Sequence, residues 1–161
     1  MRKLEIDLDE LVAEATWNDH LEVGPLRFFD RETGNIVFVD RMLFQAVDDG
    51  EDLTEFEDDE ALETARRVLN EERFLSLPGR WPDENFQIME DFVRDKTEGK
   101  IRDALTQALN LSKPFRRFKD ALCDHPEVQK QYFEYEADCH RQWIINWLHS
   151  LQIEPIDKNK Q

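Results

Sequence analysis

The densest cluster of chemistry-bearing side chains in this 161-residue sequence is basic and falls on one predicted helix over residues 113–123. Its cations are Arg116, Arg117 and Lys119. Guanidinium groups and the N–H groups at a helix N-terminus both favour phosphate or carboxylate. The three residues are therefore a candidate anion-binding or partner-binding site. The competing interpretation, which we favour, is that they offset the acids of a chain whose net charge is −16.

Two adjacent carboxylates, Glu90 and Asp91, lie beside an apolar helical stripe. General acid–base chemistry requires two carboxyl groups held at a defined separation around a substrate, which neighbouring positions on one helix do not provide. We expect Glu90 and Asp91 to face solvent or to pair with Arg116 and Arg117. Together with Asp120 they are candidate supporting carboxylates of the basic site. No catalytic residue is predicted.

A zinc site is the third chemistry to consider, since two cysteines and two histidines lie in the C-terminal third. These residues are Cys123, His125, Cys139 and His140. Their spacing matches no standard zinc finger, and adjacent positions diverge by about 100° on a helix. Free cysteines are usually buried as small hydrophobes. We therefore expect no metal and no cofactor. His20 and His149 are isolated and receive no role.

Residues 48–63 contain ten acids and no base. The run is either an acidic docking or metal-binding segment, or a solvated loop that leads into a helix N-terminus. We favour the loop, because apolar residues at helical spacing follow and acids suit the start of a helix. An EF-hand is excluded, because placing Gly50 at the sixth position of a calcium loop puts Gln45 and Val47 at the first and third, where ligands are required.

Besides the helix that follows the acidic run, the sequence of the N-terminal half predicts one helix and three strands. Asp7 caps a helix that continues to Ala15, with apolar residues on one face. Residues 26–30 and 36–40 are aromatic and β-branched, and Gly34 between them suits the turn of a β-hairpin. Residues 73–78 predict a third strand that pairs with the hairpin.

From Pro82 onward the pattern is helical. The spacing predicts about four helices, with Ser112 capping the basic one and Pro126 opening the last. Trp143 and Trp147 fall on the apolar stripe of the last helix, and we expect both to be buried in the core.

The fold class that follows is α+β, a small antiparallel sheet of a hairpin plus one strand near the N-terminus with a helical C-terminal layer. We expect one domain over residues 1–161. Residues 1–80 hold the first helix, the hairpin, the acidic loop with its helix and the third strand. Residues 81–156 form the helical layer, and residues 157–161 form a frayed tail.

The amino-acid composition argues against several classes of protein, namely nucleic-acid-binding, membrane and secreted disulfide-rich proteins. Residues 1–80 hold 22 acids and 9 bases, and residues 81–161 hold 15 and 12. This excess disfavours nucleic acid, whose binding depends on cationic side chains. No apolar run approaches the ~20 residues of a membrane span, no secretory signal is recognised, and two cysteines make no disulfide framework. We expect a cytoplasmic protein, monomeric or homodimeric, that does not bind membranes.

The chain resembles an uncharacterised family of small bacterial proteins. The resemblance rests on Ile88-Met89-Glu90-Asp91-Phe92 followed by Phe115-Arg116-Arg117-Phe118-Lys119-Asp120, and it extends to Tyr132-Phe133-Glu134-Tyr135, Trp147-Leu148, the N-terminal helix and the hairpin. It implies a bacterial cytoplasmic protein with this α+β layout, and it transfers no functional residue. The family places glycines just before the second motif, where this chain has Ser112-Lys113-Pro114. If those glycines admit a ligand, this member has lost it.

Two functions follow as hypotheses. The first is a small binding or regulatory module that acts through a protein partner and is not an enzyme. The alternative is an enzyme or binder of a small phosphate- or carboxylate-bearing ligand at residues 113–123. A flat apolar patch rimmed by charges favours the first, and a deep pocket with convergent carboxylates favours the second.

Overall fold

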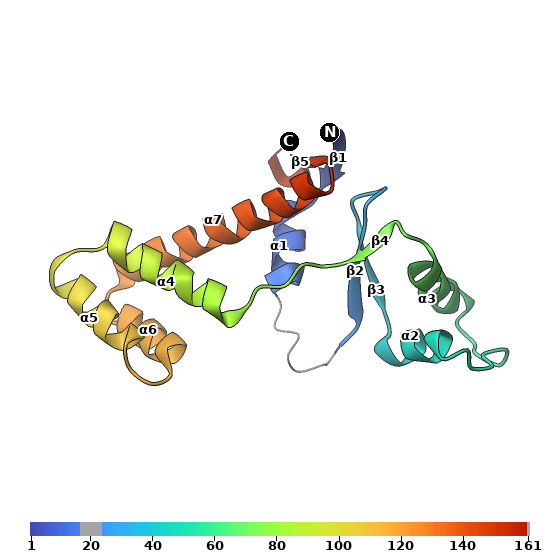
Figure 1. Cartoon of the computed structure of the whole chain (residues 1–161), viewed down its shortest axis with the longest axis horizontal. Helices are drawn as coiled ribbons and strands as arrows, with labels where there is room; N and C mark the ends of the chain where they lie inside the picture. The colour runs from blue at the N-terminus through green and yellow to red at the C-terminus, as the bar shows by residue number, and fades with distance from the viewer. Residues whose placement is uncertain (17–23, 161) are drawn as a thin grey trace. The chain divides into compact units, whose positions relative to one another are not determined.

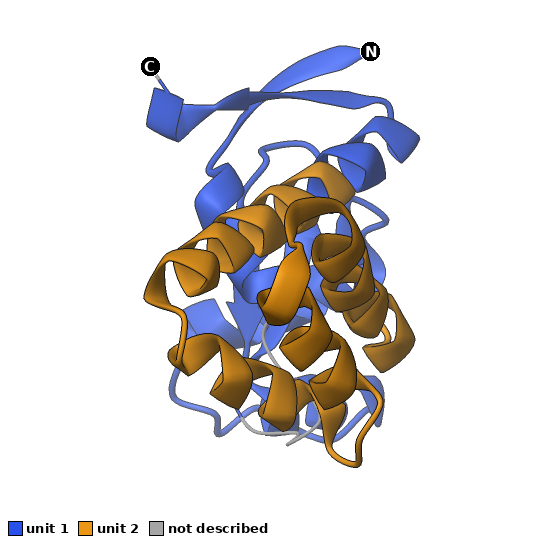
Figure 2. Ribbon diagram, turned by 90° about the vertical axis from the view of Figure 1, so that its left-hand side faces the viewer, with its two compact units in different colours: residues 1–79, 144–161 blue, residues 80–143 orange. Residues whose placement is uncertain are grey.

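The computed structural model describes residues 1–16 and 24–160 (Figure 1). These residues form two compact units (Figure 2). Unit 1 comprises residues 1–79 and 144–161, and unit 2 comprises residues 80–143. The chain therefore leaves unit 1 once and returns to it within its last helix. A single domain over the whole chain stays a prediction. The α+β fold class is confirmed.

Unit 1 contains the antiparallel sheet. Its strands are β2 (Leu26–Asp30), β3 (Ile36–Val39) and β4 (Phe74–Ser76), in the order β3-β2-β4. Both the hairpin and its third strand are confirmed. Gly34 closes the hairpin turn with a φ of 81°, and its N–H donates to the carbonyl of Asp30 at 2.8 Å.

A second sheet in unit 1 corrects the prediction for the C-terminus. β1 (Arg2–Ile6) pairs in parallel with β5 (Ile153–Asp157), and a 3₁₀ turn (Lys158–Lys160) follows. Residues 157–160 are therefore not frayed, and the helices end before residue 156. Ile6 and Ile153 are both buried, and Asn159 Nδ2 donates to Asp7 Oδ1 at 2.7 Å. Apolar burial and this hydrogen bond hold a segment whose sequence is mostly polar.

The helices of unit 1 are α1 (Leu8–Thr16), α2 (Arg41–Asp48), α3 (Asp59–Asn70) and the end of α7 (Pro126–Ser150). Asp7 caps α1, since its carboxylate accepts from the N–H of Glu10 at 3.0 Å. Asp58 caps α3 in the same way, so the acidic run does lead into a helix N-terminus. Helix α2 was not predicted. It is capped by Asp40 and buries Leu43 against α3 and β3.

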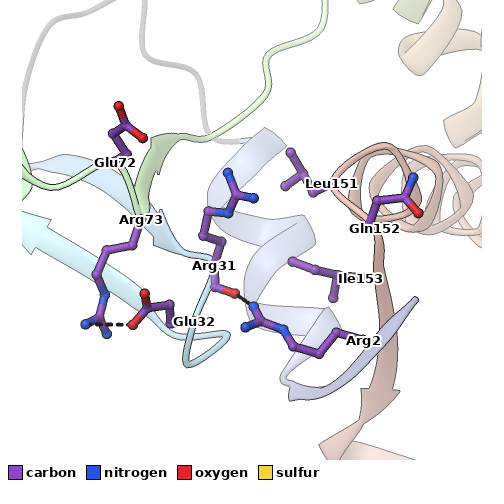
Figure 3. A pocket seen from close by; sticks show the side chains of 8 residues that line it. All are labelled: Arg2, Arg31, Glu32, Glu72, Arg73, Leu151, Gln152 and Ile153. Atoms are coloured by element: carbon purple, nitrogen blue, oxygen red, sulfur yellow. Dashed lines mark hydrogen bonds and ion pairs between the residues drawn. The ribbon is translucent and has the colours of Figure 1, made fainter.

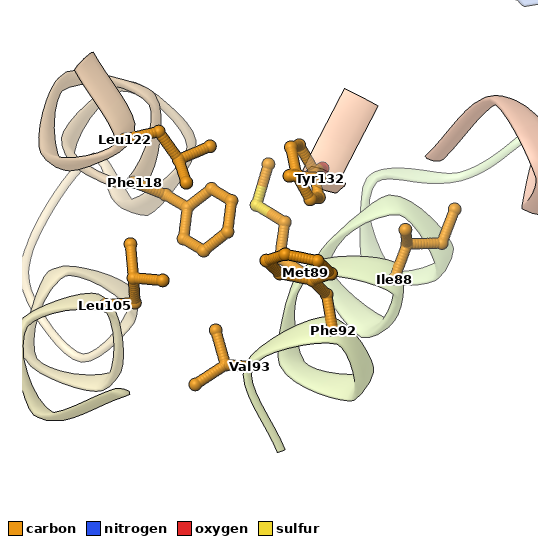
Figure 4. Packing of buried hydrophobic residues seen from close by; sticks show 8 residues of the cluster. All are labelled: Ile88, Met89, Phe92, Val93, Leu105, Phe118, Leu122 and Tyr132. Atoms are coloured by element: carbon orange, nitrogen blue, oxygen red, sulfur yellow. The ribbon is translucent and has the colours of Figure 1, made fainter. Parts of the chain in front are cut away.

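Unit 2 is a helical layer of α4 (Pro82–Lys96), α5 (Gly99–Leu109), α6 (Pro114–Cys123) and most of α7 (Pro126–Ser150). All four helices were predicted. They enclose a core in which Tyr132 is central (Figure 4). Its ring lies 5.2 Å from Phe92 and 5.0 Å from Phe118 between centroids, and its hydroxyl donates to Glu136 at 2.9 Å. Burial therefore raises the pKa of the Tyr132 hydroxyl far above its ordinary value.

The two tryptophans of α7 are half-buried, which corrects the prediction that both belong to the core. Trp147 makes an edge contact with Phe29 at 5.3 Å between ring centroids. Trp143 carries the guanidinium of Arg80 above its ring, 4.6 Å from the centroid. Each indole ring is amphipathic and keeps part of its surface exposed to solvent. The fully buried positions of this stretch are Ile144 and Leu148.

Candidate functional site

The basic helix α6 begins at a strained turn. Lys113 precedes it with a left-handed backbone (φ 53°, ψ 56°), and no side chain caps the helix. The predicted Ser112 cap is therefore wrong. The carbonyl of Ser112 instead accepts a hydrogen bond from Arg117 Nε at 2.7 Å. This bond ties the guanidinium of Arg117 to the turn that starts its own helix.

The other two candidate cations of α6 face solvent. Arg116 is 79% exposed, and its Nε lies 3.9 Å from Asp120 Oδ2 one turn along the helix. Lys119 is exposed, and its side chain has no hydrogen bond or ion pair with any residue in the described ranges. An exposed pair at this distance contributes at most about 0.5 kcal/mol. The cations of α6 therefore offset the chain's acids only weakly.

The candidate carboxylates on α4 do not reach α6. Glu90 is exposed. Asp91 accepts from Gln87 Nε2 at 2.8 Å and lies 3.2 Å from Arg94 Nη2, so its contacts are on its own helix. The structure thus favours solvent-facing carboxylates over pairing with Arg116 and Arg117. Of the proposed set, only Asp120 lies beside the basic residues.

A shallow groove of about 230 Å³ runs between α5 and α6. We name it the α5–α6 groove; its lining residues are Ala104, Gln107, Ala108, Leu111, Arg117 and Asp120. Leu111 is a large apolar side chain left 46% exposed at its edge. The groove joins a small apolar floor to a charged rim, and its lining contains one carboxylate. One large apolar side chain, Leu111, and two charged ones, Arg117 and Asp120, therefore share a small open groove.

The four residues weighed as a zinc set do not assemble one. No group of three potential ligands comes together in residues 1–16 and 24–160. Cys123 is exposed and Cys139 is half-buried, and both are free thiols. Burial raises the pKa of Cys139 and lowers that of His140. His20 lies outside the described residues.

A larger groove, which the sequence did not indicate, lies in unit 1 (Figure 3). Its volume is about 490 Å³. We name it the arginine groove; its lining residues are Arg2, Arg31, Glu32, Glu72, Arg73, Leu151, Gln152 and Ile153. They come from four separate segments of the chain. No local spacing brings them together, so only the tertiary fold reveals the site.

Asp30 anchors one side of the arginine groove. It is buried, and it accepts hydrogen bonds from Arg73 Nη2 at 2.6 Å, Arg73 Nε at 3.0 Å and the Glu32 N–H at 3.0 Å. Burial opposes its charge, but these hydrogen bonds outweigh that effect and hold the pKa of the carboxyl below its ordinary value. The pair fixes β2 to the start of β4.

Replacing Asp30 with asparagine should change the pH dependence of stability. A carboxyl with a lowered pKa stabilises the fold above its unfolded-state pKa, near 3.9, and that stability is lost as the pH falls through the folded-state value. We expect D30N to be less stable at neutral pH and to lose less stability than wild type between about pH 5 and 2. Urea titrations across this range measure it. Parallel pH profiles for the two proteins would contradict the assignment.

Comparison with known proteins identifies the family of this chain. A family model described as Uncharacterised protein family (UPF0158) matches residues 1–160. The chain belongs to this family. A curated member, UPF0158 protein PA5073 of Pseudomonas aeruginosa, is 31% identical over 84 residues. That alignment covers 52% of this chain and 55% of the relative, so the match spans about half the length of each. No solved structure matches significantly.

Membership in UPF0158 confirms the resemblance to an uncharacterised family, and the curated relative is bacterial. The family assigns no activity to any residue. The family resemblance implies glycines just before α6, and the backbone of Lys113 suggests why. Its φ of 53° is a conformation that glycine adopts without strain. Among the described helices, none is long and apolar enough to cross a membrane.

Proposed function

We propose that this UPF0158 member is a binding or regulatory module that engages a protein partner through the α5–α6 groove. The observation that supports the proposal is Leu111, which stands 46% exposed beside an alanine floor and next to cations without strong partners. Apolar side chains that carry binding energy are typically surrounded by a polar rim. The groove is too small and holds too few carboxylates to favour the enzyme alternative.

The charges around the groove favour an acidic partner. Residues 80–143 hold 13 acids and 11 bases, so unit 2 is nearly neutral although the whole chain carries −16. Arg116 and Lys119 add exposed positive charge on α6. A partner segment with one apolar side chain and flanking carboxylates would match both features, because complementary charges speed and orient association. We infer a cytoplasmic setting from the two free thiols, with a monomer or homodimer as the assembly.

The variant Leu111→Asp tests this proposal. It places a carboxylate at the edge of the groove without removing a buried side chain, so its thermal midpoint should stay close to wild type. We expect a native bacterial lysate to yield at least one protein whose capture by the tagged chain falls tenfold or more with L111D, measured by quantitative mass spectrometry. The matched control is Met42→Asp in unit 1, where the side chain is 83% exposed.

Capture that survives in Met42→Asp and is lost in Leu111→Asp supports the α5–α6 groove. Identical captured sets for wild type and both variants would exclude it as a partner surface. Loss in both variants alike would indicate a general charge effect and would equally count against this groove.

A further inference from the structure

The arginine groove brings together segments that are far apart in the sequence. Arg2 begins β1, Arg31 and Glu32 belong to the hairpin turn, and residues 72–73 precede β4 (Figure 3). Residues 151–152 connect α7 to β5, which begins at Ile153. The volume of about 490 Å³ lies within the range of roughly 300–1,000 Å³ that small-molecule sites occupy. All lining residues belong to unit 1.

One of the three arginines is already neutralised. Arg73 binds Asp30 through two nitrogens, and its Nη1 lies 3.0 Å from Glu32 Oε2. The same contacts occupy the carboxylate of Glu32. Arg73 therefore shapes the wall of the groove and does not supply its free charge.

The other two arginines have guanidinium groups available to a ligand. Arg2 Nη2 donates to the backbone carbonyl of Arg31, which holds the two residues next to each other. Neither has an ion-pair partner among the residues the structure describes. Elsewhere in this acid-rich unit, Arg27 and Arg67 do pair with glutamates. Two unpaired guanidiniums that line one groove favour an oxyanion as the ligand, since each presents a fork of N–H donors.

The opposite wall contains a strained residue. Gln152 follows α7 with a left-handed backbone, φ 62°. Its N–H donates to the carbonyl of His149 at 2.9 Å, and its own carbonyl accepts from the Arg2 N–H at 3.1 Å. Glycine fits such a position at the end of a helix with less strain. Gln152 lines the groove where the chain turns from α7 into β5, and local strain of this kind is concentrated at binding sites.

We propose that the arginine groove binds the phosphate or carboxylate group of a small molecule. Arg31 and Arg2 hold the oxyanion, and Leu151 and Ile153 offer apolar surface to the rest of the ligand. Glu72, on the rim, is a carboxylate with no partner among the described residues, so it repels the anion and limits its affinity. This site lies in unit 1 and is independent of the partner surface on α5 and α6.

The experiment titrates the full chain with inorganic phosphate or with malonate at constant ionic strength, and follows backbone amide shifts by NMR. We expect saturable shifts at residues 2, 31 and 151–153. Arg31→Gln should weaken binding by about tenfold or more, because charge-assisted hydrogen bonds are lost. Arg31 is exposed and its side chain forms no ion pair with a described residue, so this variant should melt close to wild type. Glu72→Gln should tighten binding, and Lys119→Gln on α6 should leave it unchanged.

Binding of phosphate alone, of malonate alone, or of both supports the site and identifies the chemistry of its ligand, provided that Arg31→Gln and Glu72→Gln act in opposite directions. The proposal is overturned if neither anion produces saturable shifts. It is also overturned if the shifts are centred on α6, or if Arg31→Gln binds as tightly as wild type.

Discussion

Replacing Gly34 with alanine is expected to lower the free energy of unfolding by about 2–4 kcal/mol. Two effects add at this position. Its φ of 81° is costly for any residue with a Cβ, and that Cβ would lie 2.8 Å from the carbonyl oxygen of Glu5 and 3.0 Å from Ile6 Cγ1. The first contact is with backbone, so the neighbour cannot rotate away. Urea denaturation measures the change.

Gly50→Ala is the matched control for this prediction. Gly50 also has a positive φ, 73°, but an added Cβ would meet no atom within 4 Å. It should therefore show only the backbone cost, about 1–2 kcal/mol. Equal losses for the two variants would mean that the hairpin turn does not pack against β1 as described.

The second large effect is expected at Phe118, at the centre of unit 2. Its side chain is fully buried and its ring stacks edge-on against Tyr132. Phe118→Ala should cost about 3–5 kcal/mol, because it removes a large apolar side chain and leaves a cavity. Phe133→Ala is the control, since that side chain is 47% exposed, and it should cost much less. Thermal and urea unfolding of both variants measure the difference.

The same variant tests whether the chain is one domain. Hydrogen exchange followed by mass spectrometry reports protection separately for residues 80–143 and for unit 1. If the chain unfolds as one cooperative domain, Phe118→Ala should lower protection in both units by the same free energy. A loss confined to residues 80–143 would contradict the single-domain prediction and show that the units unfold separately.

The elements that sequence reasoning recovered are those with local signals. The hairpin has a glycine turn between aromatic strands, and the four C-terminal helices have apolar periodicity and proline starts. Helix α2 was missed because residues 41–48 directly follow a strand and bury only Leu43 fully. The β1–β5 pair was missed because a parallel pair joins residues such as Ile6 and Asp157 that no turn connects.

The candidate sites also differ in whether a local sequence signal indicates them. The α6 cations were found because they are adjacent in sequence, and the structure then places Arg116 and Lys119 in solvent and Arg117 on the wall of a groove. The arginine groove could not be found, because Arg2 and Arg31 are brought together only by the packing of the hairpin against the first strand. A single arginine in each of two distant segments forms no recognisable sequence motif.

The pairing of β1 with β5 also determines the order in which the protein can fold as it is synthesised. Unit 1 is discontinuous, so its first strand leaves the ribosome long before residues 153–157 exist. At about 5–20 residues per second, β1 remains without its partner for roughly 7–30 s. Residues 80–143 are continuous and complete earlier. We therefore expect nascent chains to contain a folded helical unit 2 while the N-terminal strand is still unpaired.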